Sequence, residues 1–263
     1  MLITDVDGMQ KRSHCAPLDG TDMTSPDEDP LQQGEQRHDE TRHHFDETLD
    51  EIKAGVVELG SLVADNLERA GAAAVEGRLD LIPEVIAADE EVDRRYSELE
   101  RLTFMTIARH QPVAIDLRFL VSATRLLYEL ERSGDLVVNL AHAVERIHGI
   151  PSSKVLHGLL ERLIQESGAL LTRSLEVFSA MDAEAGKALD AEDDVVDELV
   201  ADFYREIGRE RETIGLEAGI ALTRIGRFLE RIADHAVNVG EHTAYIVTAT
   251  FPGHTHEGLS AEG

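Results

Sequence analysis

Aromatic residues are scarce in this chain of 263 residues: it contains no tryptophan, four tyrosines and seven phenylalanines. Sheets draw heavily on aromatic and β-branched side chains, so this scarcity argues against an all-β fold. Hydrophobic residues still make up 42% of the chain, enough to build a core of aliphatic side chains. The composition therefore favours helices packed through alanine, leucine and valine.

Cysteine, basic residues and long apolar runs are also few. The single cysteine, Cys15, excludes an internal disulfide framework and a zinc site made of several cysteines. With 25 basic against 52 acidic residues, the net charge of −27 disfavours binding to nucleic acid or to an anionic lipid surface. The charge suits cations or a basic face of a partner protein.

No run approaches the roughly 18–20 apolar residues that a membrane span requires. The first residues lack the basic and then apolar pattern of a secretory signal, so we expect a cytoplasmic protein without membrane insertion.

Apolar residues recur at spacings of three and four, which predicts helices, and strand-like alternation is absent. The expected helices, bounded by Gly and Pro, cover about residues 45–77, 81–109, 114–147, 154–181, 182–209 and 216–247. The fold class is therefore all-α, as two tandem pseudo-symmetric three-helix bundles at residues 42–150 and 151–248. We expect residues 1–41 to be a disordered acidic extension and residues 249–263 to be a disordered tail.

A nine-residue motif, E-R-x-x-D-x-x-x-N, occurs twice, 99 residues apart. On a helix its three polar positions share one face. The like-charged pair within it costs an isolated helix roughly 0.2–0.5 kcal/mol, and a bound cation would explain why both copies have it. The two copies place these side chains at Glu131, Asp135 and Asn139, and at Glu230, Asp234 and Asn238.

A second acidic pair is also duplicated, as Asp89/Asp93 and Asp193/Asp197. Each pair is as far before the turn of its hairpin, near Pro112 or Gly215, as the motif pair is after it. Antiparallel helices would therefore bring four carboxylates to one level in each half. Such groups raise one another's pKa or hold hard cations such as Mg²⁺, Ca²⁺, Mn²⁺ or iron. The candidate metal ligands are Asp89, Asp93, Glu131, Asp135, Asp193, Asp197, Glu230 and Asp234, with Asn139 and Asn238 as auxiliary ligands.

Other interpretations remain open at this stage. Arg132 and Arg231 could pair with neighbouring acids on a solvated helix face, in which case the chain would be a metal-free acidic helical adaptor. A ferritin-like di-metal enzyme needs Glu-x-x-His motifs, and the one match, Glu40 with His43, lies at the edge of the expected extension. No nucleophile elbow or phosphate loop is present, so we expect no enzyme. His235, beside the second motif, is interpreted as a helix-surface histidine.

The motifs resemble those of the PhoU family, the accessory and regulatory proteins of bacterial phosphate uptake. The resemblance covers about residues 42–247. The chain departs from the family pattern in its long acidic N-terminal extension and at Ser133, where the second copy of the motif has Ile232. The segments that resemble the family are F-D-E-T-L-D-E-I at residues 45–52, Q-P-V-A-I-D-L-R-F at 111–119, L-E-R-S-G-D at 130–135 and L-E-R-I-A-D-H-A-V-N at 229–238.

The resemblance implies two three-helix bundles whose carboxylate motifs hold divalent or trivalent metal ions, such as magnesium, manganese, iron or zinc. It implies association with the ATPase subunit of a phosphate ABC transporter and with a phosphate-sensing histidine kinase. The expected role is repression of the phosphate-starvation response when phosphate is plentiful, in a protein that forms homodimers.

Overall fold

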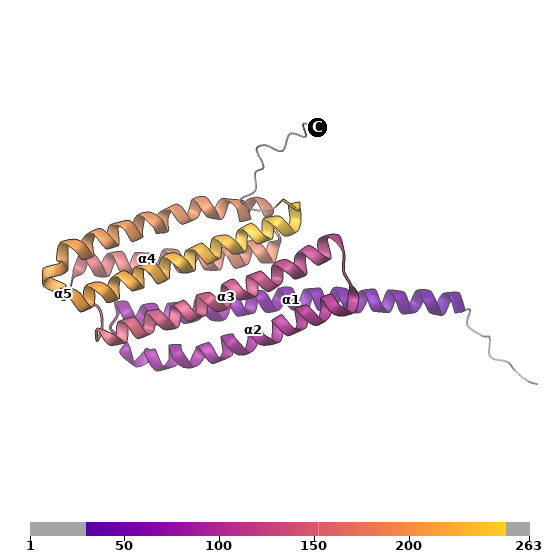
Figure 1. Cartoon of the computed structure of the whole chain (residues 1–263), viewed down its shortest axis with the longest axis horizontal. Helices are drawn as coiled ribbons and strands as arrows, with labels where there is room; N and C mark the ends of the chain where they lie inside the picture. Colours follow the sequence, from indigo (N-terminus) through magenta and orange to yellow (C-terminus); the bar gives the residue numbers. More distant parts are fainter. Residues whose placement is uncertain (1–29, 152, 251–263) are drawn as a thin grey trace, which may run out of the picture. The chain divides into compact units, whose positions relative to one another are not determined.

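Helix is the only regular secondary structure in the part of the chain that the computed structural model describes, residues 30–151 and 153–250 (Figure 1). This confirms the all-α fold class. The elements are α1 (Pro30–Val75), the short 3₁₀ helix η1 (Leu79–Leu81), α2 (Ile82–His110), α3 (Ala114–Arg146), α4 (Lys154–Ala180) and α5 (Ala183–Thr248).

The long helix α5 is interrupted at Gly215, whose φ of 80° and ψ of 168° are not helical. This backbone conformation is essentially restricted to glycine, because a Cβ would clash with the backbone. Residues 183–214 and 216–248 therefore form two helical segments, as the glycine in the sequence predicted. Asp182 caps the first segment, because its carboxylate accepts hydrogen bonds from the backbone N–H groups of Glu184 and Ala185.

The first helix begins earlier than the sequence suggested. Residues 30–41, expected to be disordered, are helical and continue into the packed part of α1. Pro30 suits a first helical position, and a polar segment that extends an existing helix avoids the cost of nucleation. The rest of the expected extension, residues 1–29, and residues 251–263 of the expected tail lie outside the described residues.

The described residues from His43 onward form one compact unit. Its core is mostly aliphatic, as predicted, and burying each large apolar side chain contributes about 1.5–3 kcal/mol. The seam that α1 contributes consists of Phe45, Ile52, Val56, Leu59, Val63, Leu67 and Ala70, all buried.

Packing within this unit brings the two motif-bearing helices together. Helix α3 packs against α2 and α5, and α4 packs against α5. Arg118, near the start of α3, donates from Nε to the backbone carbonyl of Ile246 at the end of α5, 3.1 Å away. Ser133, near the middle of α3, meets His235, near the middle of the second segment of α5. The helices therefore run antiparallel, and the E-R-x-x-D motifs lie midway along their contact.

Candidate metal layers on two helical hairpins

The first carboxylate layer, formed by Asp89 and Asp93 of α2 and Glu131 and Asp135 of α3, lies where these two helices pack together. Burial raises the pKa of Asp89 to about 6, with further contributions from the nearby charges of Asp93 and Asp135. The pKa of Glu131 is also raised, first by burial and then by Asp135. A methyl group at Gly134 would lie 3.1 Å from Oδ1 of Asp89, so the missing side chain is what lets the helices approach here. The four predicted carboxylates of this half therefore act on one another electrostatically.

The second layer repeats this arrangement within the two segments of α5. Burial raises the pKa of Asp193 to about 7, and the charges of Asp197 and Asp234 raise it further. Burial and Glu230 raise the pKa of Asp234 in turn. Oδ1 of Asp193 is buried and has no hydrogen-bond partner within the described residues. An acceptor oxygen without a donor beside other carboxylates can accept a cation.

One carboxylate of each layer is paired with an arginine of its own helix. Arg132 donates to Asp135 over 3.0 Å, and Arg227 lies 2.7 Å from Glu230. The expected pairing of Arg132 is therefore observed, whereas in the second half the ion pair is made by Arg227. Such partly exposed pairs are worth at most about 1 kcal/mol, so a cation can displace the arginine.

As they stand, the carboxylates do not converge on a point. Within the described residues, no group of three or more Asp, Glu, His or Cys side chains is placed to hold a metal ion. The donor set still fits a hard cation, since each layer offers only carboxylate oxygens and its shared negative charge is poorly compensated. Binding would require Asp135 or Glu230 to rotate away from its arginine.

The two predicted auxiliary ligands have other partners. The side-chain amide of Asn139 donates to the backbone carbonyl of Asp135, 2.7 Å away on its own helix. The Asn238 side chain hydrogen-bonds to the carboxylate of Glu129 on α3, which lies outside either layer. Asn139 thus bonds to the backbone of a layer residue and Asn238 to a residue outside the layers, and their role as auxiliary ligands stays a prediction.

His235 is buried between α3 and α5, which corrects its interpretation as a surface histidine. Its Nδ1 lies 2.9 Å from Oγ of Ser133, and its Nε2 lies 3.7 Å from the Glu129 carboxylate. Burial, followed by the charges of Arg231 and Arg132, lowers the pKa of His235 to about 4. The imidazole is therefore neutral at pH 7 and serves as a polar contact between the two halves.

Both residues of this polar contact are positions at which the two halves of the sequence differ. The second motif has Ile232 where the first has Ser133, and the first half has Leu136 where the second has His235. These two departures from the repeat face each other across the contact. The sequence therefore marks both residues as departures from the repeat, but only the structure shows that they are in contact.

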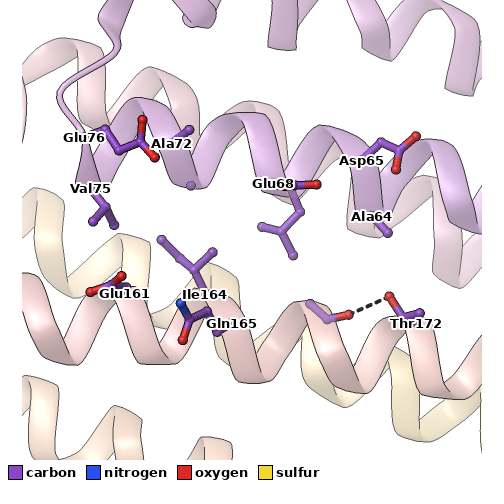
Figure 2. A pocket seen from close by; sticks show the side chains of 13 residues that line it. Ala64, Asp65, Glu68, Ala72, Val75, Glu76, Glu161, Ile164, Gln165 and Thr172 are labelled. Carbon is purple, nitrogen blue, oxygen red and sulfur yellow. Dashed lines mark hydrogen bonds between the residues drawn. The ribbon is translucent and has the colours of Figure 1, made fainter.

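A separate groove of about 460 Å³ lies between α1 and α4 (Figure 2). Small residues such as Gly71 and Gly168 let the helices approach, and Leu67 and Ile164 contribute apolar surface. Its four acidic side chains, from Asp65, Glu68, Glu76 and Glu161, are exposed. The groove does not share a residue with either carboxylate layer.

In the described part of the chain, no helix combines the length and the apolar character that crossing a membrane would need.

Comparison with known proteins agrees with this architecture. The PhoU domain model matches the chain twice, at residues 56–144 and 160–243. The phosphate-specific transport system accessory protein PhoU homolog of Deinococcus radiodurans is 34% identical over 218 residues, covering 80% of this chain and 99% of that protein. The homolog from Synechocystis is 28% identical and covers 79% and 92%, respectively.

Solved structures share the fold. The crystal structure of PhoU from Pseudomonas aeruginosa superposes with a TM-score of 0.74 at 23% identity, over 78% of this chain and all of that one. The phosphate transport system regulatory protein PhoU from Streptococcus pneumoniae gives a TM-score of 0.72 at 24% identity, covering 79% and 98%. With two domain matches and a relative aligned over almost its whole length, the chain belongs to the PhoU family.

Proposed function

We propose that this protein is an accessory and regulatory component of phosphate-specific transport. The observation that carries the proposal is the match to relatives of that name over nearly their whole length, in both PhoU domains. The strongly negative charge and the surface carboxylates suit a protein that acts by contact with other proteins. The role is regulatory rather than enzymatic.

The proposal extends to a mechanism. The protein acts on the cytoplasmic side, as a homodimer, by binding the ATPase subunit of a phosphate ABC transporter and a phosphate-sensing histidine kinase. When phosphate is plentiful, these contacts lower uptake and keep the phosphate-starvation response repressed.

Deletion in the native host tests the regulatory role. A reporter fused to a phosphate-starvation promoter should become active in high phosphate, and the intact gene supplied in trans should restore repression. A reporter that stays silent in the deletion strain would contradict negative regulation, whatever the metal content of the protein.

We further propose that the two carboxylate layers hold metal ions. The support is their duplication, their oxygen-only donor sets, the raised pKa values of Asp89 and Asp193, and the unpartnered oxygen of Asp193. A bound cation would neutralise repulsion between the helices of each hairpin. It would thereby stiffen the surface that a partner recognises.

Metal binding can be tested directly. After gentle purification, elemental analysis should find metal, and the apo protein should take up Mn²⁺ or Mg²⁺ in calorimetric titration. Changing Asp135 and Asp234 together to asparagine should abolish uptake, whereas Asp50→Asn, at an exposed position of α1 outside both layers, should not. No metal in the wild type and no uptake would favour the metal-free adaptor, which is compatible with the same regulatory role.

A further inference from the structure

The second segment of α5 opens with large apolar side chains in solvent. Leu216 is 81% exposed and Ile220 is 55% exposed. They line a pocket of about 350 Å³ together with Ala143 and Arg146 of α3 and Arg224 of α5. We call this the α3/α5 pocket. Exposed aliphatic side chains that border a concave surface are typical of protein-binding sites.

The charges around the pocket differ from those of the whole chain. Arg146 and Arg224 both line it, and Glu217 is the one acidic residue among the residues that form it. Within the described residues, neither arginine forms an ion pair, although Arg224 lies 5.5 Å from the ring centre of Phe228. In a chain of net charge −27, two arginines beside an apolar pocket form a local site for a carboxylate.

The duplicated fold provides an internal comparison. In the first half, Leu117 and Val121 correspond to Leu216 and Ile220 and are less exposed, at 38% and 43%. The positions that correspond to Ala143 and Arg146 hold His242 and Tyr245, and both are partly buried. The small side chain of Ala143 therefore leaves room where the other half has an imidazole. The α3/α5 pocket takes residues from both halves, and its lining differs from the residues at the corresponding positions of the repeat.

We propose that the α3/α5 pocket docks an amphipathic helical segment of a partner protein. Aliphatic side chains spaced i and i+4 on that segment would enter between Leu216 and Ile220, and a flanking carboxylate would pair with Arg146 or Arg224. This goes beyond the proposed regulatory function, since it assigns a surface and a chemistry to a contact.

The charges favour this occupant over two others. A symmetric contact between two copies would place the arginines of one pocket against those of the other. An anionic lipid surface would face the acidic surroundings of the pocket as well as the pocket itself. A single helix is small enough to meet the arginines alone, because the Debye length of about 8 Å screens more distant acids at physiological salt.

The test uses the full-length protein and two fluorescein-labelled, alanine-rich helical peptides. One carries leucines at i and i+4 flanked by glutamates, and the other has lysines in place of the glutamates. Fluorescence anisotropy should show tighter binding of the glutamate peptide. The double change Leu216→Ser with Ile220→Ser should weaken binding by about tenfold or more, equivalent to at least about 1.4 kcal/mol.

The matched control is Leu117→Ser with Val121→Ser, which alters the corresponding residues of the first half and should leave binding unchanged. Arg146→Glu with Arg224→Glu should reverse the preference between the peptides. The proposal is overturned if the glutamate peptide does not bind, if both peptides bind equally, or if the control variant loses binding to the same extent. It is also overturned if sedimentation shows a dimer that Leu216→Ser with Ile220→Ser dissociates, because a second copy would then occupy the pocket.

Discussion

Asp193 combines partial burial, four acidic neighbours and an oxygen that has no hydrogen-bond donor within the described residues. Its pKa of about 7 in the folded state exceeds the ordinary value of 3.8. Below about pH 4 the group is protonated in both states and has no effect on stability. As the pH rises from about 4 to 7, the unfolded chain loses its proton first, so folding becomes progressively less favourable. Without metal, the charged carboxylate is a cost to the fold at neutral pH.

Replacing Asp193 by asparagine should therefore stabilise the metal-free protein at pH 8. Solvent screening of this half-exposed group keeps the expected gain to about 1 kcal/mol, and the gain should vanish near pH 4. With saturating Mn²⁺ the sign should reverse, because the wild type gains more binding free energy than the variant. Urea denaturation at both pH values, with and without metal, measures this. A gain that is independent of pH would show that charge is not its cause.

The contact between Ser133 and His235 should contribute measurably to the free energy of unfolding. Ser133→Ala removes a buried hydrogen-bond partner of the imidazole and should cost about 1 kcal/mol of unfolding free energy. Ser122→Ala is the matched control on the same helix, because Ser122 is also buried but its hydroxyl has no partner within the described residues. It should be neutral or stabilising in the same denaturation assay. Equal effects of the two changes would mean that the His235 contact contributes nothing.

For single residues, the sequence predicted which carboxylates lie close together better than it predicted which side chains form hydrogen bonds and ion pairs. Counting residues on both sides of each turn predicted that the carboxylates of each half lie side by side. The raised pKa values of Asp89 and Asp193 reflect this proximity. The hydrogen-bond and ion-pair partners of Arg227, Asn139 and Asn238 could not be predicted in this way. They depend on which rotamer each side chain adopts and on how α3 meets α5, neither of which is encoded in helical periodicity.

The backbones of the two α5 segments come close together at Gly186 and Gly240. A Cβ on Gly240 would lie 2.6 Å from the backbone oxygen of Gly186, too near for any side chain. Gly240→Ala must therefore separate the two segments and should cost about 1–3 kcal/mol. Gly208→Ala is the control, since nothing lies within 4 Å of its added methyl group, and it should gain about 0.5–1 kcal/mol of helix propensity.

Thermal unfolding of both glycine variants checks this prediction. A Gly240→Ala protein as stable as the wild type would mean that the two segments can shift apart without loss of packing. A loss of stability in both variants would instead point to a general effect of side chains on α5.

Helix ends were predictable wherever a residue with special backbone chemistry marked them. Gly215 and Asp182 define the turns of the second half as the sequence indicated. The start of α1 was not predictable, because residues 30–41 lack apolar periodicity and their helix is an extension of a packed one. Apolar periodicity marks the face of a helix that packs against a core, so a polar segment without it gives no such signal.

For the whole molecule, the net charge of −27 should lower stability at low ionic strength through self-repulsion. Raising NaCl from 10 to 150 mM shortens the Debye length from about 30 to about 8 Å, so repulsion between distant acids is largely screened. Screening should stabilise the metal-free protein by about 1 kcal/mol, equivalent to a rise in Tm of about 2–4 °C.

The same measurement separates screening from site binding. Low concentrations of MnCl2, at constant ionic strength, should raise the Tm further and saturate, because binding follows site occupancy and screening does not. A variant with both Asp135→Asn and Asp234→Asn should keep the response to NaCl and lose the response to Mn²⁺. A Tm that falls with NaCl would mean that surface ion pairs such as Arg173–Glu176 outweigh the repulsion, since salt weakens those pairs as well. A variant that still responds to Mn²⁺ would place the metal outside the two carboxylate layers.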